Sequence, residues 1–417
     1  MTVIGGVRIP ERRVVWRWAK ENLFDGWFNT VLTVMTLSII VIALYGLGRF
    51  VFVSAEWEAI DANRRLFFVG RFPSEETWRV WACLLMLSGL SGLSWGLWAR
   101  IGPRMAAVGA IVTIPVFLFI GLQEMDRLAA DLGLVTNPVA LNTMGTLLLF
   151  GTGYALGHFV LAPSRFSSLA RNVAVVLWLA SVVVTSALLR EVPTNLWGGL
   201  LLTMILTVVG IVVAFPIGVL LALGRASTFP VIRLFCVAYI ELIRAVPLLT
   251  LFFMAAFILP LALGPERDLS IFTFLTGWDL DLVLRVMVAL IMFSSAYLAE
   301  IVRGGLQAVP RGQVDAAKAL GLGTLRILAL IVMPQALRAV IPAIVSQFIS
   351  LFKDTSLVFI VGLTELLGVS RQVTGQLEFI GRQAEVLVFI ALVYWVIAFN
   401  MSRASQQLEK NLGVGER

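Results

Sequence analysis

The chain has 417 residues, of which 59% are hydrophobic and only 14% are charged, and its formal net charge is +7. Soluble globular domains carry about 25% charged residues, so this composition excludes a soluble enzyme or binding module. The basic residues are scattered in short gaps between apolar segments, which argues against nucleic-acid binding. The sequence therefore predicts an all-α, polytopic membrane protein.

Membrane-spanning helices need roughly 20 apolar residues each, because the hydrocarbon core of a bilayer is about 30 Å thick. Ten stretches meet this requirement, and the seventh is long enough to be bent or broken at Pro247. The predicted spans are 30–52, 80–98, 105–122, 144–161, 173–189, 200–223, 232–263, 282–302, 327–351 and 385–402.

The charges in the gaps between these spans predict the topology. Lysine and arginine in short loops collect on the cytoplasmic side, and here they lie before the first span and in alternate gaps, while the opposite gaps are acidic or mixed. We therefore expect both termini and segment 303–326 in the cytoplasm. The first apolar stretch is longer than that of a signal peptide and follows a polar start, so no cleavable signal is predicted.

The spans divide the chain into two halves. We expect a cytoplasmic segment at 1–28, a five-span extension at 29–194, a five-span core at 195–408 and a cytoplasmic tail at 409–417. The longest extracytoplasmic loop, 53–79, carries aromatic side chains that suit a segment lying at the membrane interface; a contact for a partner subunit is the alternative. These aromatic residues are Trp57, Phe67, Phe68, Phe72 and Trp78.

Several kinds of site are not predicted. His158 is the only histidine, and Cys83 and Cys236 lie in separate apolar stretches, so we expect no metal site and no disulfide framework. For His158, a packed and hydrogen-bonded place inside the bundle is favoured over a functional one. A Walker A loop needs Gly-Lys-Ser/Thr, but none of the four lysines follows a glycine. We expect no catalytic residue and no cofactor in this chain.

A polar stretch between two apolar segments predicts a short amphipathic helix. Pro310 suits its first turn and Gly321 suits the left-handed position after its last turn. Val314, Ala317 and Leu320 fall on one face at helical spacing. A helix this short is unstable alone, so it is expected to be held by a partner.

This stretch also carries a resemblance. Asp315-Ala316-Ala317, then Gly321, then Ile331-Val332-Met333-Pro334 resembles the Glu-Ala-Ala, Gly, Ile-x-Leu-Pro pattern of the membrane subunits of bacterial ABC importers. Asp315 replaces Glu and Met333 replaces Leu. Segments 199–227, 239–253, 296–323 and 351–362 resemble successive motifs of the polar amino-acid permease family, and 18–33 resembles the start of the longer general amino-acid permeases.

The resemblance implies a type I ABC importer permease core in the bacterial inner membrane, carrying L-amino acids. It implies cytoplasmic ATPase subunits that bind ATP and Mg, a second permease subunit, identical or homologous, and a periplasmic amino-acid-binding protein. Segment 309–322 would be the coupling helix that contacts the ATPase. Its contact residues would be Gly312, Gln313, Asp315, Ala316, Ala317, Leu320 and Gly321.

Charged residues inside the core segments are candidates for the transport path, since such residues tend to face a bundle interior or water. Lys353, Asp354, Thr355 and Ser356, with Glu300, supply the charges and hydroxyls that an amino acid needs. A membrane boundary or a turn between helices is the alternative for Lys353 and Asp354.

Two further pairs are spaced i, i+3 on their predicted helices. Glu241 with Arg244, and Glu300 with Arg303, can each form an ion pair. A gate and a purely structural role are equally compatible with this spacing.

Three other functions compete with an amino-acid importer. The cargo could be an opine, a polyamine or another small polar solute. An ion-driven secondary transporter would show an internal repeat, and the first half holds no counterpart of GQVDAAKALG. A membrane scaffold would use the short polar helix only to hold a cytoplasmic partner.

Overall fold

The computed structural model describes residues 2–4, 7–9, 18, 20–98, 138–263 and 281–412. The chain divides into two compact units, Met1–Ala59 and Ile60–Arg417. The first unit has an antiparallel hairpin of β1 (Thr2–Ile4) and β2 (Val7–Ile9), with Thr2 opposite Ile9. It also contains α2 (Gly26–Arg49), which continues as the π-helical turn η1 (Phe50–Ser54).

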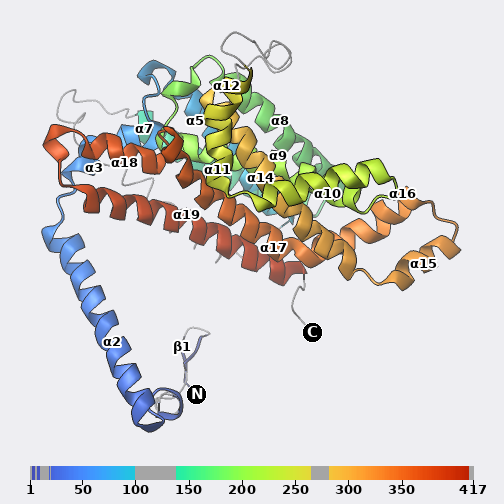
Figure 1. Ribbon diagram of the computed structural model, residues 1–417, viewed down its shortest axis with the longest axis horizontal. Coiled ribbons are helices and arrows are strands. Elements are labelled where there is room, and N and C mark those ends of the chain that lie inside the picture. The colour runs from blue at the N-terminus through green and yellow to red at the C-terminus, as the bar shows by residue number, and fades with distance from the viewer. Residues whose placement is uncertain are drawn as a thin grey trace. The chain divides into compact units, whose positions relative to one another are not determined.

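The described residues of the second unit are mainly helical (Figure 1). The described helices between residues 58 and 198 are α3 (Glu58–Ala62), α4 (Arg64–Val69), η2 (Ser74–Glu76), α5 (Thr77–Trp98), α7 (Pro138–Ala155), η3 (Leu156–Leu161), α8 (Ser167–Leu189) and η4 (Thr194–Leu196). The first two residues of α3 belong to the first unit.

The helices of the second half follow the same order as the predicted core spans. They are α9 (Gly199–Arg225), α10 (Pro230–Ala245), α11 (Leu248–Phe253), η5 (Met254–Ile258), α12 (Leu259–Leu263), α14 (Leu282–Ala308), α15 (Arg311–Ala319), α16 (Thr324–Ile327), η6 (Leu328–Val332), α17 (Met333–Asp354), η7 (Thr355–Val361), α18 (Leu366–Thr374), η8 (Leu377–Phe379) and α19 (Gln383–Leu412).

Seven described helices are long and apolar enough to cross a membrane, or eight if the bent pair formed by α10 and α11 to α12 is one span; Gly145–Leu161 is a shorter apolar helix. Together they match nine of the ten predicted spans. The tenth, 105–122, lies outside the described residues, as do residues 413–417 of the expected tail. The chain is thus a polytopic helical membrane protein, as predicted.

The break in the seventh span occurs at the predicted proline. Val246 is extended, with φ −101° and ψ 132°, as expected for a residue that precedes proline. Pro247 is the N-cap residue of α11, and the chain bends by 102° between the two helices. One long apolar stretch of sequence therefore forms two helices that point in different directions.

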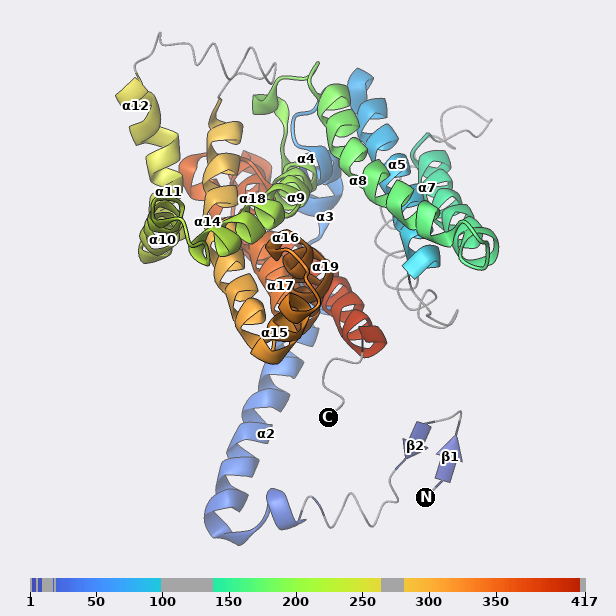
Figure 2. The same cartoon turned by 90° about the vertical axis from the view of Figure 1, so that its right-hand side faces the viewer.

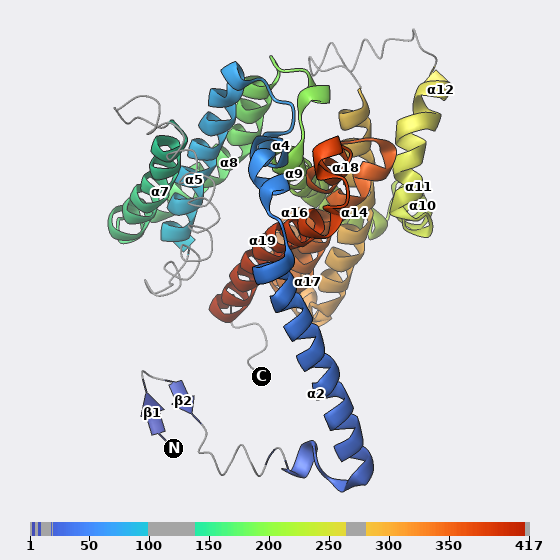
Figure 3. The same ribbon diagram turned by 90° about the vertical axis from the view of Figure 1, so that its left-hand side faces the viewer.

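Two groups of helices make up the second unit. Helices α5, α7 and α8 pack together on one side, and α9, α14, α17, α18 and α19 form the other group (Figures 2 and 3). In the second group α9 and α14 approach closely, because Gly218 leaves room for the neighbouring helix. A Cβ at Gly218 would lie 2.7 Å from Leu298 Cβ and 3.0 Å from the Ser295 carbonyl oxygen.

Helix α17 runs antiparallel to α14. Near the start of α17, the Ala336 carbonyl oxygen lies 2.5 Å from where a Cβ of Gly305 would be. Near the end of α17, Leu351 lies level with Leu290, because both face Gly210 on α9. Helix α17 therefore runs from the end of the bundle that carries α15 to the end that carries α18, and Figure 1 shows these ends well apart.

The segment around α4 packs into the second unit between α9 and α18 (Figure 3). Gly70 has φ +65°, and a Cβ there would overlap Gly198 Cα. Gly199 has φ +57°, and a Cβ there would overlap the Phe67 carbonyl oxygen. Only glycine combines positive φ with so close an approach of two backbones. The Phe67 ring also meets the Phe389 ring edge to face, at 5.2 Å.

This packing corrects the interpretation of loop 53–79 as an interfacial segment. Phe67 and Phe72 are completely buried in the protein and Phe68 is partly buried, whereas Trp78 is exposed. Trp57 donates its indole N–H to the Val51 carbonyl, at 3.1 Å. The aromatic residues of this loop therefore pack between α4, α9 and α18 in part, instead of all lying at the membrane interface.

Candidate functional site

Helix α15 begins after Pro310 and ends before Gly321, as predicted. Gly321 has φ +77°, and the helix closes with Gly321 N–H donating to the Lys318 carbonyl at 2.9 Å and Leu322 N–H to the Ala317 carbonyl at 3.1 Å. This is the Schellman pattern that satisfies the last carbonyl groups of a helix. The ends of α15 are therefore fixed by local sequence.

One face of α15 packs inward and the others are exposed. Ala317 is buried and Val314 is partly buried, as their spacing predicted. Leu320 is instead 81% exposed, because the chain leaves the helix at that residue, which has ψ 3°. The remaining exposed residues named by the resemblance are Gly312, Gln313, Asp315, Ala316 and Gly321.

A side-chain hydrogen bond joins α15 to the long helix α17. Gln335 donates from Nε2 to Gln313 Oε1 at 2.5 Å and to the Ile331 carbonyl at 2.8 Å. Gln335 lies in the first turn of α17. This hydrogen bond therefore connects α15 to the start of α17.

A cluster of ion pairs joins three helices at the same end of the second unit. Arg225 at the end of α9 donates to Glu241 on α10 at 2.9 Å and to Glu300 on α14 at 2.7 Å. Arg303 forms a two-nitrogen contact with Glu300, with distances of 2.8 to 3.1 Å, and Arg244 lies 3.7 Å from it. Glu300 is thus the centre of the cluster.

The structure revises the predicted pairing of these residues. Glu300 and Arg303 pair as the i, i+3 spacing indicated, but Glu241 pairs with Arg225 instead of Arg244. Arg244 turns toward α14, where its guanidinium lies 5.4 Å from the centre of the Tyr297 ring. Arg225 was missed as a partner because it is 16 and 75 residues away from its two carboxylates.

The segment Lys353–Ser356 lies where α17 changes into the tighter helix η7. Lys353 is exposed, Asp354 and Ser356 are partly buried, and Thr355 is buried. The Thr355 hydroxyl donates to the Phe352 carbonyl at 2.6 Å, and the Ser356 hydroxyl donates to the Lys353 carbonyl at 2.7 Å. The Ser356 hydroxyl oxygen, which is partly exposed, keeps lone pairs that can accept a further hydrogen bond, whereas Thr355 is fully buried.

Glu300 does not lie with this segment. Leu351 is level with Leu290, and Glu300 follows ten residues later on α14, which at 1.5 Å per residue is about 15 Å along the helix. Lys353–Ser356 continues from Leu351 in the opposite direction. The structure therefore places Glu300 near the α15 end of the bundle and Lys353–Ser356 near the α18 end.

A buried polar network lies next to Lys353–Ser356 and was not predicted. Glu365 is fully buried and accepts hydrogen bonds from Leu367 N–H at 2.7 Å and Gly368 N–H at 2.8 Å, which caps α18. Tyr394 on α19 donates to the same carboxylate at 3.1 Å. Burial raises the pKa of the Glu365 carboxyl to about 7, against the lowering effect of these three hydrogen bonds.

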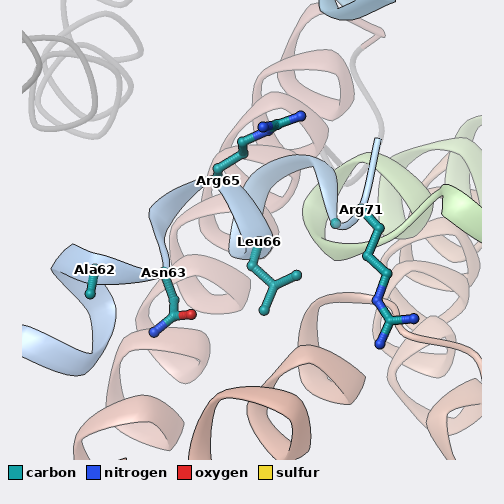
Figure 4. Close-up of a pocket in the computed structure, with 6 residues that line it drawn as sticks. Ala62, Asn63, Arg65, Leu66 and Arg71 are labelled. Atoms are coloured by element: carbon teal, nitrogen blue, oxygen red, sulfur yellow. The ribbon is translucent and has the colours of Figure 1, made fainter. Parts of the chain in front are cut away.

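A hollow of about 320 Å³ lies beside α4, lined by Ala62, Asn63, Arg65, Leu66, Gly70 and Arg71. Figure 4 shows that the guanidinium groups of Arg65 and Arg71 point in different directions. Arg65 donates to the Phe72 carbonyl at 2.5 Å. The two arginines therefore do not converge on one ligand, and the hollow has no arrangement suited to a compact anion.

No cluster of three or more potential metal ligands occurs in the described part of the chain. His158 stacks on the Tyr154 ring at 5.4 Å and meets Phe159 edge to face at 4.9 Å. These aromatic contacts come from its own helix, and His158 is partly buried; the hydrogen-bonded place inside the bundle stays a prediction.

The described residues thus form a membrane-spanning helical bundle with a short, mostly exposed helix, α15, attached to it and a polar segment, Lys353–Ser356, within it. Residues 214–414 match the family described as the binding-protein-dependent transport system inner membrane component. The inner membrane amino-acid ABC transporter permease protein YhdY of Escherichia coli is 33% identical over 95% of this chain and 93% of its own length. The chain belongs to this family, as an amino-acid ABC importer permease of the inner membrane.

Two other relatives show how the similarity is distributed. The glutamate/glutamine/aspartate/asparagine transport system permease protein BztC of Rhodobacter capsulatus is 35% identical over 95% of this chain and 93% of its own length. The probable glutamine ABC transporter permease protein GlnP of Bacillus subtilis is 35% identical over 51% of this chain and 92% of its own length. A crystal structure of an amino acid ABC transporter with histidines is 28% identical, covering 51% of this chain and 91% of that one, with a TM-score of 0.42.

Proposed function

We propose that this chain and a second permease subunit, identical or homologous, form the path of an ATP-driven amino-acid importer, with α15 as the helix that couples the path to a separate ATPase. The observation that carries the proposal is the Gln313 to Gln335 hydrogen bond, which ties a short, mostly exposed helix to a membrane-spanning one. ATP and Mg are bound by the partner ATPase subunits.

Helix α17 gives this proposal a mechanical route. Its first turn contacts α15, and its last residues are Lys353 and Asp354. Closure of two ATPase subunits would bring their two coupling helices together, and each α17 would carry the displacement along its length. The Lys353–Ser356 segment would then open toward the extracytoplasmic side, where a periplasmic binding protein delivers the amino acid. This orientation places both termini in the cytoplasm.

The proposed substrates are L-amino acids with a carboxylate or carboxamide side chain. An amino acid carries an ammonium and a carboxylate, which Asp354 and Lys353 complement in charge, while the partly exposed Ser356 offers a hydroxyl oxygen. The names of BztC and GlnP, which include glutamate, glutamine, aspartate and asparagine, support this class. A permease for an opine, a polyamine or another small polar solute is the alternative.

The cluster centred on Glu300 is proposed to act at the cytoplasmic side of the path. It joins α9, α10 and α14 through Arg225, Glu241 and Arg303. Because three helices share one set of ion pairs, the cluster can hold the inner end of the path together as a gate between transport steps.

The coupling role is tested by tagging the chain in its native membrane, solubilising it gently and identifying the co-purifying proteins by mass spectrometry. A Walker-motif ATPase and a second permease are expected with the wild type. Asp315→Arg should release the ATPase, because it reverses a charge on the exposed face of α15. Glu378→Arg, the same change on the exposed turn η8 at the other end of the bundle, is the matched control. An ATPase retained by Asp315→Arg would contradict the proposal.

The substrate role is tested in proteoliposomes that contain the purified complex and its binding protein. Uptake of radiolabelled L-glutamate, L-glutamine, L-aspartate and L-asparagine identifies the preferred substrate. Asp354→Asn keeps the side-chain shape and removes the charge, so uptake should fall at least about tenfold, as for a lost charged hydrogen bond, while the complex still assembles and hydrolyses ATP. Unchanged uptake of all four amino acids would return Asp354 to a structural role.

A further inference from the structure

Tyr394 contacts the chain on both sides of Lys353 and Asp354. Its ring packs on the Phe352 ring, with centroids 5.0 Å apart, and its hydroxyl lies next to the Thr355 hydroxyl. Phe352 immediately precedes Lys353, and Thr355 immediately follows Asp354. One side chain on α19 thus holds both flanks of the two charged residues.

Glu365 fixes the position of the Tyr394 hydroxyl. Its Oε2 accepts from Tyr394 at 3.1 Å and from Leu367 N–H at 2.7 Å, and its Oε1 accepts from Gly368 N–H at 2.8 Å. The two backbone donors belong to the first turn of α18, so the carboxylate cannot rotate without uncapping that helix. Since Glu365 has no exposed surface, water cannot replace a lost partner.

A threonine on α9 completes the network. The Thr203 hydroxyl accepts from Leu366 N–H at 3.1 Å and donates to the Gly199 carbonyl at 3.1 Å. It also lies within hydrogen-bond reach of Tyr394. Three elements, α9, α18 and α19, therefore meet at the Tyr394 hydroxyl.

The segment next to Tyr394 lies where the backbone changes from one helical conformation to another. At Asp354 the α-helical pattern of α17 gives way to the 3₁₀ pattern of η7, with Thr355 at φ −58° and ψ −27°. A change between these two patterns alters which side chains share a face, and such joints often lie at hinges. Contacts from outside the helix therefore decide where the Lys353 and Asp354 side chains point.

We propose that Glu365 and Tyr394 are positioning residues that hold the Lys353–Ser356 segment in the conformation that receives the amino acid. This inference rests on the proposed function, in which that segment contacts the substrate. Neither residue contacts the substrate itself. Glu365 acts on Tyr394, and Tyr394 acts on the joint between α17 and η7.

The test uses the complete importer complex in lipid nanodiscs, with two readouts. Hydrogen–deuterium exchange of the peptide covering residues 353–358 reports the conformation of the segment, and uptake of radiolabelled L-glutamine, or whichever of the four amino acids the wild type prefers, reports transport. Tyr394→Phe keeps the ring on Phe352 and removes the hydroxyl. We expect exchange at 353–358 to rise and uptake to fall, each on the order of fivefold, as for one lost buried hydrogen bond.

A matched control removes another partly buried tyrosine hydroxyl from the same unit. Tyr239 donates to the Met292 carbonyl at 3.1 Å and lies 3.1 Å from the Ser295 hydroxyl, away from the 353–358 segment. Tyr239→Phe should therefore leave exchange at 353–358 unchanged. Glu365→Gln should reproduce the effect of Tyr394→Phe, and where it fails to assemble, Thr355→Val removes the hydroxyl that lies next to Tyr394 on the segment itself.

The outcomes separate this inference from the proposed function. Unchanged exchange at 353–358 in both Tyr394→Phe and Thr355→Val would overturn the positioning role. The substrate role of the segment would still be tested separately, by uptake in Asp354→Asn. Faster exchange with full uptake would overturn the substrate role of the segment, and with it the positioning role. Faster exchange together with reduced uptake supports both.

Discussion

Arg225 and Glu300 lie on different helices and meet at 2.7 Å, which makes Glu300 the shared partner of three arginines from α9, α10 and α14. Its side chain is only 16% exposed, whereas that of Glu241 in the same cluster is 56% exposed. The two carboxylates therefore differ greatly in how much solvent screens them, although both pair with Arg225.

Glu300→Gln should destabilise the complex because three guanidinium groups lose their common carboxylate. Breaking a buried ion pair costs about 3 to 5 kcal/mol, and partial exposure reduces this to about 1 to 3 kcal/mol. Glu241→Gln is the matched control and should cost less than about 1 kcal/mol. The midpoint of thermal unfolding in detergent measures both, and equal shifts would contradict the central place of Glu300.

Gly218→Ala should destabilise the packing of α9 against α14, since the added Cβ would lie 2.7 Å from Leu298 Cβ. Overpacking of this kind costs about 1 to 3 kcal/mol. Gly151→Ala on α7 adds the same methyl group where nothing lies within 4 Å, and should be neutral or slightly stabilising. Thermal unfolding of the two variants should therefore shift in different directions, and a stable Gly218→Ala would show that α9 and α14 can separate without cost.

Glu365 should make stability depend on pH. Its pKa is about 7 in the folded chain against an ordinary value of 4.5, so the folded state binds the proton more tightly than the unfolded state does. The free energy of unfolding should therefore fall as pH rises from about 4.5 to about 7 and level off above, by about 3 kcal/mol in total. Burial sets this direction, because it outweighs the hydrogen bonds from Leu367, Gly368 and Tyr394 that favour the charged form.

This dependence is measured as the difference between wild type and Glu365→Gln in thermal unfolding between pH 5 and pH 8. The glutamine does not titrate, so other ionisable groups cancel in the comparison. Parallel pH profiles for the two proteins would show that Glu365 has an ordinary pKa in the folded chain.

Gln335→Ala should weaken coupling without dissociating the ATPase. It removes the hydrogen bond from α17 to Gln313 but leaves the exposed face of α15 unchanged. We expect ATP hydrolysis to continue while the amount of amino acid transported per ATP falls severalfold. Gln372→Ala on α18 is the control, since α18 lies at the other end of the bundle. A normal ratio of transport to hydrolysis in Gln335→Ala would contradict the proposed route through α17.

Much of the fold followed from local patterns in the sequence. Apolar runs long enough to cross a bilayer predicted nine of the helices now seen, Pro247 predicted the break between α10 and α11, and Pro310 with Gly321 predicted the ends of α15. Each of these features depends on residues that are neighbours in the chain. Periodicity and turn residues therefore carry enough information to place them.

The missed features all depend on contacts between distant segments. Tyr394 and Glu365 are 29 residues apart, and Arg225 and Glu300 are 75 apart. Nothing in their local sequence distinguishes a buried carboxylate with three donors from a solvated one. The rotation of each helix about its axis decides these pairings, and long apolar helices with little amphipathic bias give weak information about that rotation.

The close backbone contact between Gly70 and Gly198 also bears on attempts to shorten the gene. GlnP of Bacillus subtilis matches only 51% of this chain, which suggests a fragment starting near residue 195 as a minimal permease. Such a fragment would keep Gly198, Gly199 and Phe389 but lose the backbone that covers them. A shortened gene would therefore need a redesigned surface where residues 67–70 now cover these three residues.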